Sequence, residues 1–153
     1  MRKVLAGVLV AASLSCSSDD DSTSSGGSSG SSDFASEQAK CVDIINQYRA
    51  ENSLPPLARW TDQESCASTE AESDGKSNKG HGAFPRCGEL AQNECPNFAG
   101  SVSKNLPTCL GAMWAEGPGG GHYEAMSSTK YTKVACGIYE LPNGNFWAVQ
   151  DFR

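Results

Sequence analysis

The chain has 153 residues, a formal net charge of −6, seven cysteines and only two histidines. Its length suits one compact domain and is too short for two large ones. Only 12 residues are Lys or Arg, which argues against a nucleic acid as partner because phosphate recognition needs clustered basic side chains. The histidine count excludes a histidine-rich metal centre, so any imidazole chemistry depends on His81, His122 or both.

The N-terminal residues have the pattern of an export signal. Arg2 and Lys3 precede an apolar run over residues 4–14, which fits the hydrophobic region of a signal peptide and is too short to span a bilayer. Cys16 follows small residues, as at the processing site of a bacterial lipoprotein. We therefore predict a signal peptide over residues 1–16 with Cys16 lipidated, so that the protein meets the membrane only through this N-terminal anchor. Ordinary signal cleavage nearby is the alternative, and it exports the protein as well.

A disordered, flexible tether is expected after this cysteine, over residues 17–35. Residues 17–33 are all Ser, Gly, Thr or Asp, and such a composition has no apolar surface to bury. Residues 26–30 match the G-x-S-x-G pattern of serine hydrolases, but that motif needs a preceding strand and a following helix. The match is therefore attributed to chance, and the folded domain is placed at residues 36–153.

Hydrophobic periodicity predicts three helices in the first part of the domain. The first covers residues 36–52, where apolar side chains recur with helical spacing. The second begins at Thr61, whose spacing from Glu64 is that of a capping box. Residues 81–100 are rich in turn formers and are expected to form a loop with at most one short strand. The third helix follows over about residues 108–116 and ends at a glycine-rich segment.

The last part of the domain has the period of β-strands. Val134, Cys136 and Ile138 alternate with smaller or polar residues. A second extended run covers residues 146–152, and an Asn-Gly turn signal at residues 143–144 separates the two runs. This pattern predicts an antiparallel hairpin. Helices followed by a hairpin indicate an α+β fold in which helices and a sheet form layers.

The domain contains six of the seven cysteines, and in an exported chain they are expected to form three disulfides. A zinc cluster would need close C-x-x-C pairs, and the sequence has none. The connectivity is open, although we favour a Cys41–Cys66 pair because both residues fall in the first turns of successive helices. The six residues are Cys41, Cys66, Cys87, Cys95, Cys109 and Cys136.

Polar residues that can form a site lie near both histidines in the sequence. His81 and His122 stand beside glycines, which leave an imidazole uncrowded. Glu116 comes at the end of the third predicted helix, where the helix dipole disfavours a carboxylate. Gln92 and Glu94 would face the same way on a strand. Two imidazoles with a carboxylate can bind a divalent ion such as Zn²⁺, and the alternative is that these are solvated loop residues.

Four segments of the domain match the signatures of a known family. They are Asn-Gln-Tyr-Arg at residues 46–49 with Leu-Pro-Pro-Leu at 54–57 and Trp60, Ala-Gln-Asn at 91–93, Met-Trp-Ala-Glu at 113–116, and Gly-His-Tyr at 121–123 with Lys-Val-Ala-Cys-Gly at 133–137. In order and spacing these segments resemble the CAP superfamily, also called the SCP domain, of cysteine-rich secretory proteins, antigen 5 and pathogenesis-related 1 proteins. The resemblance extends over residues 41–152.

The resemblance implies a disulfide-stapled three-layer α-β-α sandwich with a central antiparallel sheet. It also implies an open cleft with a tetrad, in which the two histidines of family members can bind a divalent metal, often zinc. Many members bind sterols, lipids or partner proteins. Gln92 stands where many members have a glutamate, which weakens a general-base role there unless Glu94 substitutes. The tetrad here consists of His81, Gln92, Glu116 and His122.

We therefore predict an exported, lipid-anchored CAP-domain protein of the cell envelope that binds a small lipid-like ligand or an envelope protein, with a metal-capable cleft at His81 and His122. The alternative is a zinc-assisted peptidase or esterase that uses Glu116 as general base towards a metal-bound water. A third hypothesis is a structural envelope protein whose polar cleft is vestigial.

Overall fold

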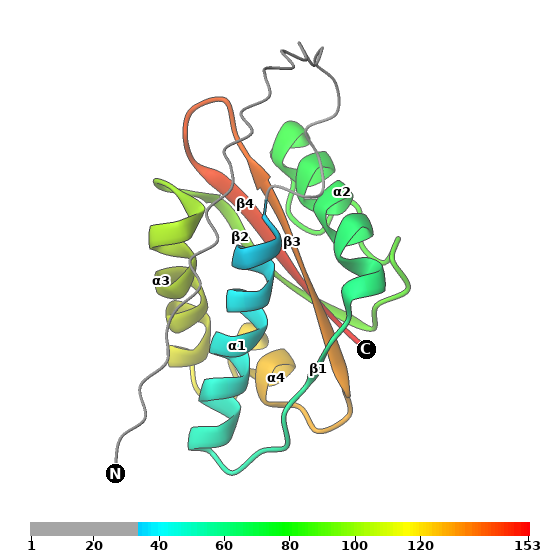
Figure 1. Ribbon diagram of the computed structural model, residues 1–153, viewed down its shortest axis with the longest axis vertical. Coiled ribbons are helices and arrows are strands. Elements are labelled where there is room, and N and C mark those ends of the chain that lie inside the picture. The colour runs from blue at the N-terminus through cyan, green and yellow to red at the C-terminus, as the bar shows by residue number, and fades with distance from the viewer. Residues whose placement is uncertain (1–33) are drawn as a thin grey trace, which may run out of the picture.

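The computed structural model describes residues 34–153, so the predicted signal peptide, Cys16 and residues 17–33 of the tether lie outside the described residues. Helices and strands alternate in the first half of the described chain, and two successive helices and two successive strands complete it (Figure 1). They are α1 (Ala35–Glu51), β1 (Ala58–Arg59), α2 (Thr61–Ser77), β2 (Ala91–Phe98), α3 (Val102–Ala115), α4 (Gly121–Ser127), β3 (Lys133–Glu140) and β4 (Phe146–Phe152).

A single sheet with the strand order β1-β3-β4-β2 forms the middle layer. Strand β4 pairs antiparallel with β2 on one side and with β3 on the other, and β3 and β4 form the predicted hairpin. The two-residue β1 pairs parallel with the start of β3. Helices α1, α3 and α4 lie on one side of this sheet and α2 lies on the other (Figure 1). The predicted α+β fold, a three-layer α-β-α sandwich, is confirmed.

Alternation along the strands divides the core between the two faces of the sheet. On β3, Cys136 and Ile138 belong to the larger apolar cluster shared with α1 and α3, whereas Ala135 belongs to the smaller cluster shared with α2. Both faces of β4 are covered, so this strand is buried along its whole length. Its polar residues Gln150 and Asp151 therefore need partners inside the protein.

The backbones of α2 and the sheet approach very closely at Gly137 of β3. A Cβ at this position would lie 2.1 Å from the carbonyl carbon of Ala67 and 2.5 Å from the backbone nitrogen of Ser68. No side chain larger than a hydrogen atom fits there. The absence of a side chain at Gly137 therefore allows α2 to lie close to the central strands and to bring its polar side chains near them.

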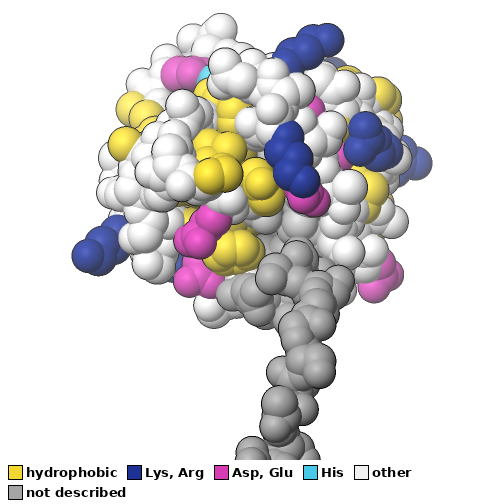
Figure 2. All heavy atoms as spheres, turned by 90° about the horizontal axis from the view of Figure 1, so that it is seen from above, with side chains coloured by type: hydrophobic (Ala, Val, Ile, Leu, Met, Phe, Trp, Pro, Cys, Tyr) yellow, Lys and Arg dark blue, Asp and Glu magenta, His cyan; other side chains and the backbone are white. Residues whose placement is uncertain are grey.

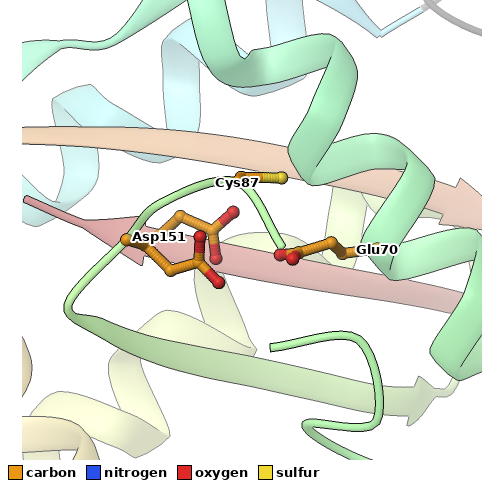
Figure 3. A group of neighbouring side chains, drawn as sticks. Glu70, Cys87 and Asp151 are labelled. Atoms are coloured by element: carbon orange, nitrogen blue, oxygen red, sulfur yellow. The ribbon is translucent and has the colours of Figure 1, made fainter. Parts of the chain in front are cut away.

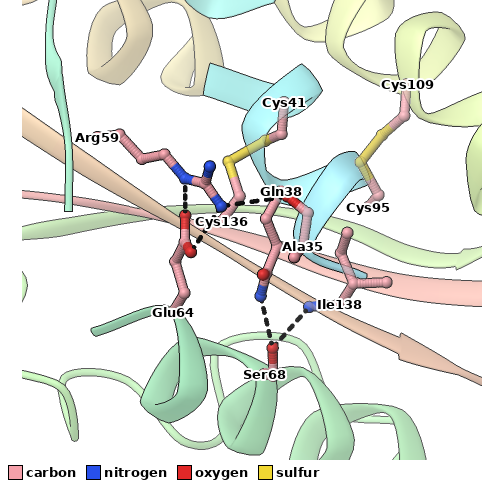
Figure 4. The surroundings of a disulfide bond; sticks show 10 residues. All are labelled: Ala35, Gln38, Cys41, Arg59, Glu64, Ser68, Cys95, Cys109, Cys136 and Ile138. Atoms are coloured by element: carbon pink, nitrogen blue, oxygen red, sulfur yellow. Dashed lines mark hydrogen bonds and ion pairs between the residues drawn. A yellow bond between two sulfur atoms is a disulfide. The ribbon is translucent and has the colours of Figure 1, made fainter. Parts of the chain in front are cut away.

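Ser68 of α2 covers the edge of β3 beyond its short partner β1. Its hydroxyl accepts a hydrogen bond from the backbone N–H of Ile138 at 3.3 Å and another from Nε2 of Gln38 in α1 at 3.2 Å (Figure 4). A strand edge left without such partners exposes backbone groups to other chains. Ser68 thus joins the two outer layers around the edge of the sheet.

The domain cysteines form the three predicted disulfides, but the favoured Cys41–Cys66 pair is wrong. The observed pairs are Cys41–Cys136, Cys66–Cys87 and Cys95–Cys109 (Figure 4 shows the first and third). Because α1 and α2 pack on opposite faces of the sheet, Cys41 meets β3 while Cys66 meets the loop before β2. Three disulfides are typical of a protein that folds in an oxidising compartment, which supports export.

Two elements differ from the sequence prediction in kind or length. Residues 81–100 contain an eight-residue strand, β2, rather than a short one, and α4 is an additional helix that was not predicted and follows the glycine-rich end of the third helix. The predicted capping box does not form, because α2 starts after Trp60 and without a side-chain cap. Glu64 instead pairs with Arg59 at 2.6 Å (Figure 4).

Helix α3 begins before Pro107, earlier than predicted. Proline has no N–H and leaves the carbonyl of Ser103, four residues before it, without a helical donor. Nζ of Lys40 in α1 donates to this carbonyl at 3.0 Å. A contact between two helices thus replaces the bond that the proline removes, and the helix continues through it.

The outer surface carries charges of both signs. On the face drawn in Figure 2, the Lys and Arg side chains of the described residues stand in separate places among acidic and apolar ones. That face, as far as residues 34–153 form it, offers no continuous basic surface of the kind that phosphate recognition needs. Within the same residues, no helix combines the length and apolar character needed to cross a membrane.

Replacing Gly137 by alanine is expected to lower the free energy of unfolding by about 3 kcal/mol, because the added methyl group must displace backbone atoms of α2. Urea unfolding followed by circular dichroism measures this change. Gly121→Ala is the matched control, since a Cβ at that position has no neighbour within 4 Å and stability should change little. Equal stability of the two variants would contradict the close approach of α2 to β3.

Candidate functional site

A cleft of about 570 Å³ lies where the end of α3 and the start of α4 meet β2 and the loop before it. All four residues of the predicted tetrad line this cleft: His81, Gln92, Glu116 and His122. The remaining lining residues are small or polar and consist of Ala91, Asn93, Gly120, Gly121 and Ala125. Residues from separate segments of the chain therefore share one open site.

Glu116 at the end of α3 holds His122 at the start of α4. Its Oε2 accepts the backbone N–H of His122 at 3.0 Å, and its Oε1 lies 2.5 Å from Nδ1 of the same residue. Gly120 permits this approach, because a Cβ there would lie 2.3 Å from Cβ of Glu116. The hydrogen bonds from His122 hold the pKa of Glu116 below its usual value. The start of α4 thus compensates a carboxylate placed at the unfavourable end of α3.

The contact with Glu116 determines which ring nitrogen of His122 is free. A carboxylate only accepts hydrogen bonds, so Nδ1 carries the hydrogen and Nε2 of the neutral ring keeps its lone pair. Nδ2 of Asn93 also donates to the backbone carbonyl of His122 at 3.0 Å and fixes the backbone. His122 can therefore offer Nε2 to a metal ion or a hydrogen-bond donor in the cleft.

Gln92 orients His81 from the floor of the cleft. Nε2 of Gln92 donates to Oε2 of Glu70 at 2.8 Å and to Oδ1 of Asp151 at 2.9 Å. Both hydrogens of the amide nitrogen are thereby used, and Oε1 of Gln92 faces Nδ1 of His81 at 3.0 Å. Because this oxygen only accepts, Nδ1 of His81 carries the hydrogen and Nε2 keeps its lone pair. The two histidines therefore have the same nitrogen free.

The loop that carries His81 rests on two buried carboxyl groups. The backbone of His81 is left-handed, with φ of 55°, and its N–H donates to Oε1 of Glu94 at 2.9 Å. A Cβ at Gly80 would lie 3.2 Å from Oε2 of Glu94, and one at Gly82 would lie 3.0 Å from Oδ1 of Asp74. The glycines on either side of His81 therefore let the buried acids approach the backbone.

Glu94 does not take the place of a cleft glutamate. It faces the same side of β2 as Gln92, as predicted, but it lies beneath the His81 loop, where it also accepts from Nε1 of Trp147 at 3.1 Å. Burial raises the pKa of Glu94 to about 7, against the opposing effect of the His81 N–H. Its contacts make it a support for the loop, and Gln92 is the β2 side chain that reaches the tetrad.

Sequence reasoning missed three further buried carboxyl groups beneath Gln92. They belong to Glu70 of α2, Glu89 of the loop before β2 and Asp151 of β4, and Figure 3 shows Glu70 and Asp151 pointing into the same space. Burial raises the pKa of Asp151 to about 9, and the charges of Glu70 and Glu89 act in the same direction. Burial likewise raises the pKa of Glu70. One signal existed in the sequence, the helical spacing of Ala67, Glu70, Ala71 and Asp74.

A three-layer sandwich with the four tetrad residues in one open cleft is the arrangement that the CAP resemblance implies. The model of the Cysteine-rich secretory protein family, CAP, matches residues 42–152, and the chain belongs to this family. The matched residues cover most of the domain that the structure describes. No curated protein sequence matches the chain significantly.

Two solved structures resemble the fold at low sequence identity. An outer surface protein from Borrelia burgdorferi has a TM-score of 0.59 and 17% identity, with 78% of this chain and 93% of that protein covered. An extracellular protein containing a SCP domain from Bacillus anthracis has a TM-score of 0.55 and 18% identity. That match covers 77% of this chain and 40% of the Bacillus protein. At such identities the likeness shows the fold alone.

The raised pKa of Asp151 predicts a loss of stability as the pH rises. Between its ordinary value near 4 and about 9, the folded protein keeps a proton on Asp151 that the unfolded chain releases, so unfolding becomes easier with increasing pH. For one group the slope is at most about 1.4 kcal/mol per pH unit. Asp151→Asn cannot titrate but keeps an oxygen for Gln92, and its stability should vary less between pH 5 and pH 9.

Urea unfolding at several pH values in metal-free buffer measures this difference. Asp62→Asn, at the exposed start of α2, is the control and should follow the wild type. The same pH dependence in Asp151→Asn and the wild type would show that Asp151 is ionised in the folded protein.

Proposed function

We propose that the protein is an exported CAP-domain binding module, attached to the cell envelope by a lipid on Cys16, whose cleft binds a divalent metal ion through His81 and His122. The observation that carries this proposal is the hydrogen bonding of the imidazole rings of His81 and His122. In each, Nδ1 is engaged by an acceptor of the protein, so that Nε2 is the nitrogen left for a ligand.

The donor set of the cleft fits zinc. Neutral imidazole is among the preferred ligands of Zn²⁺, and ligating histidines typically donate their other N–H to a carboxylate or carbonyl oxygen. Glu116 and Gln92 supply these two acceptors. A bound ion would supply an electron-pair acceptor for an oxygen atom of a ligand. The small side chains of Ala91 and Ala125 leave room beside the histidines for a lipid-like ligand or a segment of an envelope protein.

Export is supported by three independent features. The N-terminal residues have the pattern of a signal peptide followed by a cysteine, and the domain contains three disulfides. The two similar structures are described as an outer surface protein and an extracellular protein. Lipid attachment at Cys16 would keep the domain at the envelope, whereas cleavage without lipidation would release it.

A binding role is favoured over a zinc-assisted peptidase or esterase by the contacts of Glu116. Both oxygens of Glu116 accept hydrogen bonds from His122, and these bonds lower its pKa, which makes it a weaker base. In this arrangement Glu116 acts as a positioning residue for His122. Zinc-dependent turnover of peptides or esters that is abolished in Glu116→Gln would favour the hydrolase instead.

Zinc binding by the full chain, measured by isothermal titration calorimetry, tests the cleft. We expect the double variant His81→Ala/His122→Ala to lose binding, and Glu116→Ala to weaken it by about 10–100-fold because the orienting acceptor of His122 is gone. Binding should also weaken in acid, since a protonated imidazole cannot ligate a metal. Lys130→Ala, exposed and outside the cleft lining, is the control. Equal zinc affinity in the double variant and the wild type would reject the site.

A further inference from the structure

A second polar site lies beneath the cleft, between α2, the loop before β2 and strand β4. Glu70, Glu89 and Asp151 contribute its carboxyl groups, with exposed fractions of 0%, 3% and 0%. One oxygen from each of these groups lies within 4.8 Å of the others. Neither Glu70 nor Asp151 lines the cleft, and this cluster is separate from the two histidines.

No positive side chain compensates these carboxyl groups within residues 34–153. None of the ion pairs in this part of the chain involves Glu70, Glu89 or Asp151. The donors that reach the cluster are neutral: the amide nitrogen of Gln92, the backbone N–H of Cys87 and that of Arg86, which donates to Oε1 of Glu70 at 2.9 Å. Buried carboxylates without a counter-charge are strongly unfavourable, so the cluster needs protons or a cation.

Glu89 points to a cation rather than to a closed hydrogen-bond network. Both of its oxygens are buried, and neither has a hydrogen-bond partner among the described residues. Oδ2 of Asp151 has a partner only when that carboxyl group is protonated and hydrogen-bonds Glu70. Buried polar atoms are almost always paired, so the two oxygens of Glu89 are an incomplete set of contacts. A cation held by Glu89 and its two acidic neighbours would complete it.

The atoms present select the type of cation. The ligands are carboxylate oxygens, which suit hard ions such as Ca²⁺, Mg²⁺ and Mn²⁺ rather than Zn²⁺. Sγ of Cys87 lies within the same distance but is bonded to Cys66, so it offers no thiolate. Mg²⁺ usually keeps several of its water ligands, whereas Ca²⁺ takes carboxylate oxygens in a flexible geometry. Three carboxyl groups that are almost fully buried therefore suit Ca²⁺ better.

We propose that Glu70, Glu89 and Asp151 form a binding site for one Ca²⁺ ion, separate from the histidine cleft. The fold prepares this site from distant parts of the chain. The Cys66–Cys87 disulfide joins α2 to the loop, one helical turn before Glu70 and two residues before Glu89. Strand β4, paired with both β2 and β3, brings Asp151 to the same place (Figure 3).

Calcium binding and thermal unfolding of the full chain, freed of metal with a chelator, test this site. We expect equilibrium dialysis to give one Ca²⁺ per chain. We also expect the Tm to rise by about 5 °C at a tenfold excess of Ca²⁺ over its Kd, because the ion binds only the folded form. The same concentration of Mg²⁺ should raise the Tm less. An absence of bound Ca²⁺, or an equal response to Mg²⁺, would overturn the assignment.

Variants identify the residues that bind the ion. Glu89→Gln keeps the shape of the side chain and removes one buried charge, so it should fold at least as stably in chelator and lose the calcium response. Glu72→Gln removes an exposed carboxylate from α2, the helix that carries Glu70, and should keep that response. A calcium response retained in Glu89→Gln would overturn the site. His81→Ala/His122→Ala should lose zinc but keep calcium, so the two proposals fail separately.

Discussion

The burial of carboxyl groups between α2 and the sheet is the constraint on which the cleft depends. Glu70 and Asp151 accept both hydrogens of the Gln92 amide, and this fixes the direction of its oxygen. The oxygen in turn fixes the ring of His81, whose backbone rests on buried Glu94. The chemistry of an open site is therefore decided by side chains that never reach its surface, and Gly137 allows α2 to bring them close enough.

The two histidines are held by acceptors of different strength. His122 donates to the exposed and ionised carboxylate of Glu116, whereas His81 donates to a neutral amide. A carboxylate partner raises the basicity of an imidazole ligand more than an amide does. The free nitrogen of His122 is therefore the stronger electron donor of the pair. An ion in this cleft would be held mainly at the α4 side, with His81 as the weaker ligand.

Local sequence patterns predicted those parts of the fold that depend on neighbours along the chain. The alternation around Ile138 and the Asn-Gly turn were enough for the hairpin, and helical spacing was enough for α1. The pairing of Cys41 could not be predicted, since it depends on which helix covers which face of the sheet. Strand β2 was hidden by turn-forming residues such as Pro96, which an edge strand tolerates near the irregular register between Cys95 and Phe98.

The tetrad was predictable because its motifs resemble those of a family, but the reason for Gln92 was not. A glutamate at this position, as in many CAP proteins, would set a carboxylate against Glu70 and Asp151, where the amide now donates two hydrogen bonds. Like charges at hydrogen-bond distance in a buried site cannot all be ionised. The amide and the buried acids therefore form a matched set, and either one alone would leave polar groups unpaired. A glutamine therefore suits this position of the cleft better than a glutamate would, because the acid cluster lies directly below it.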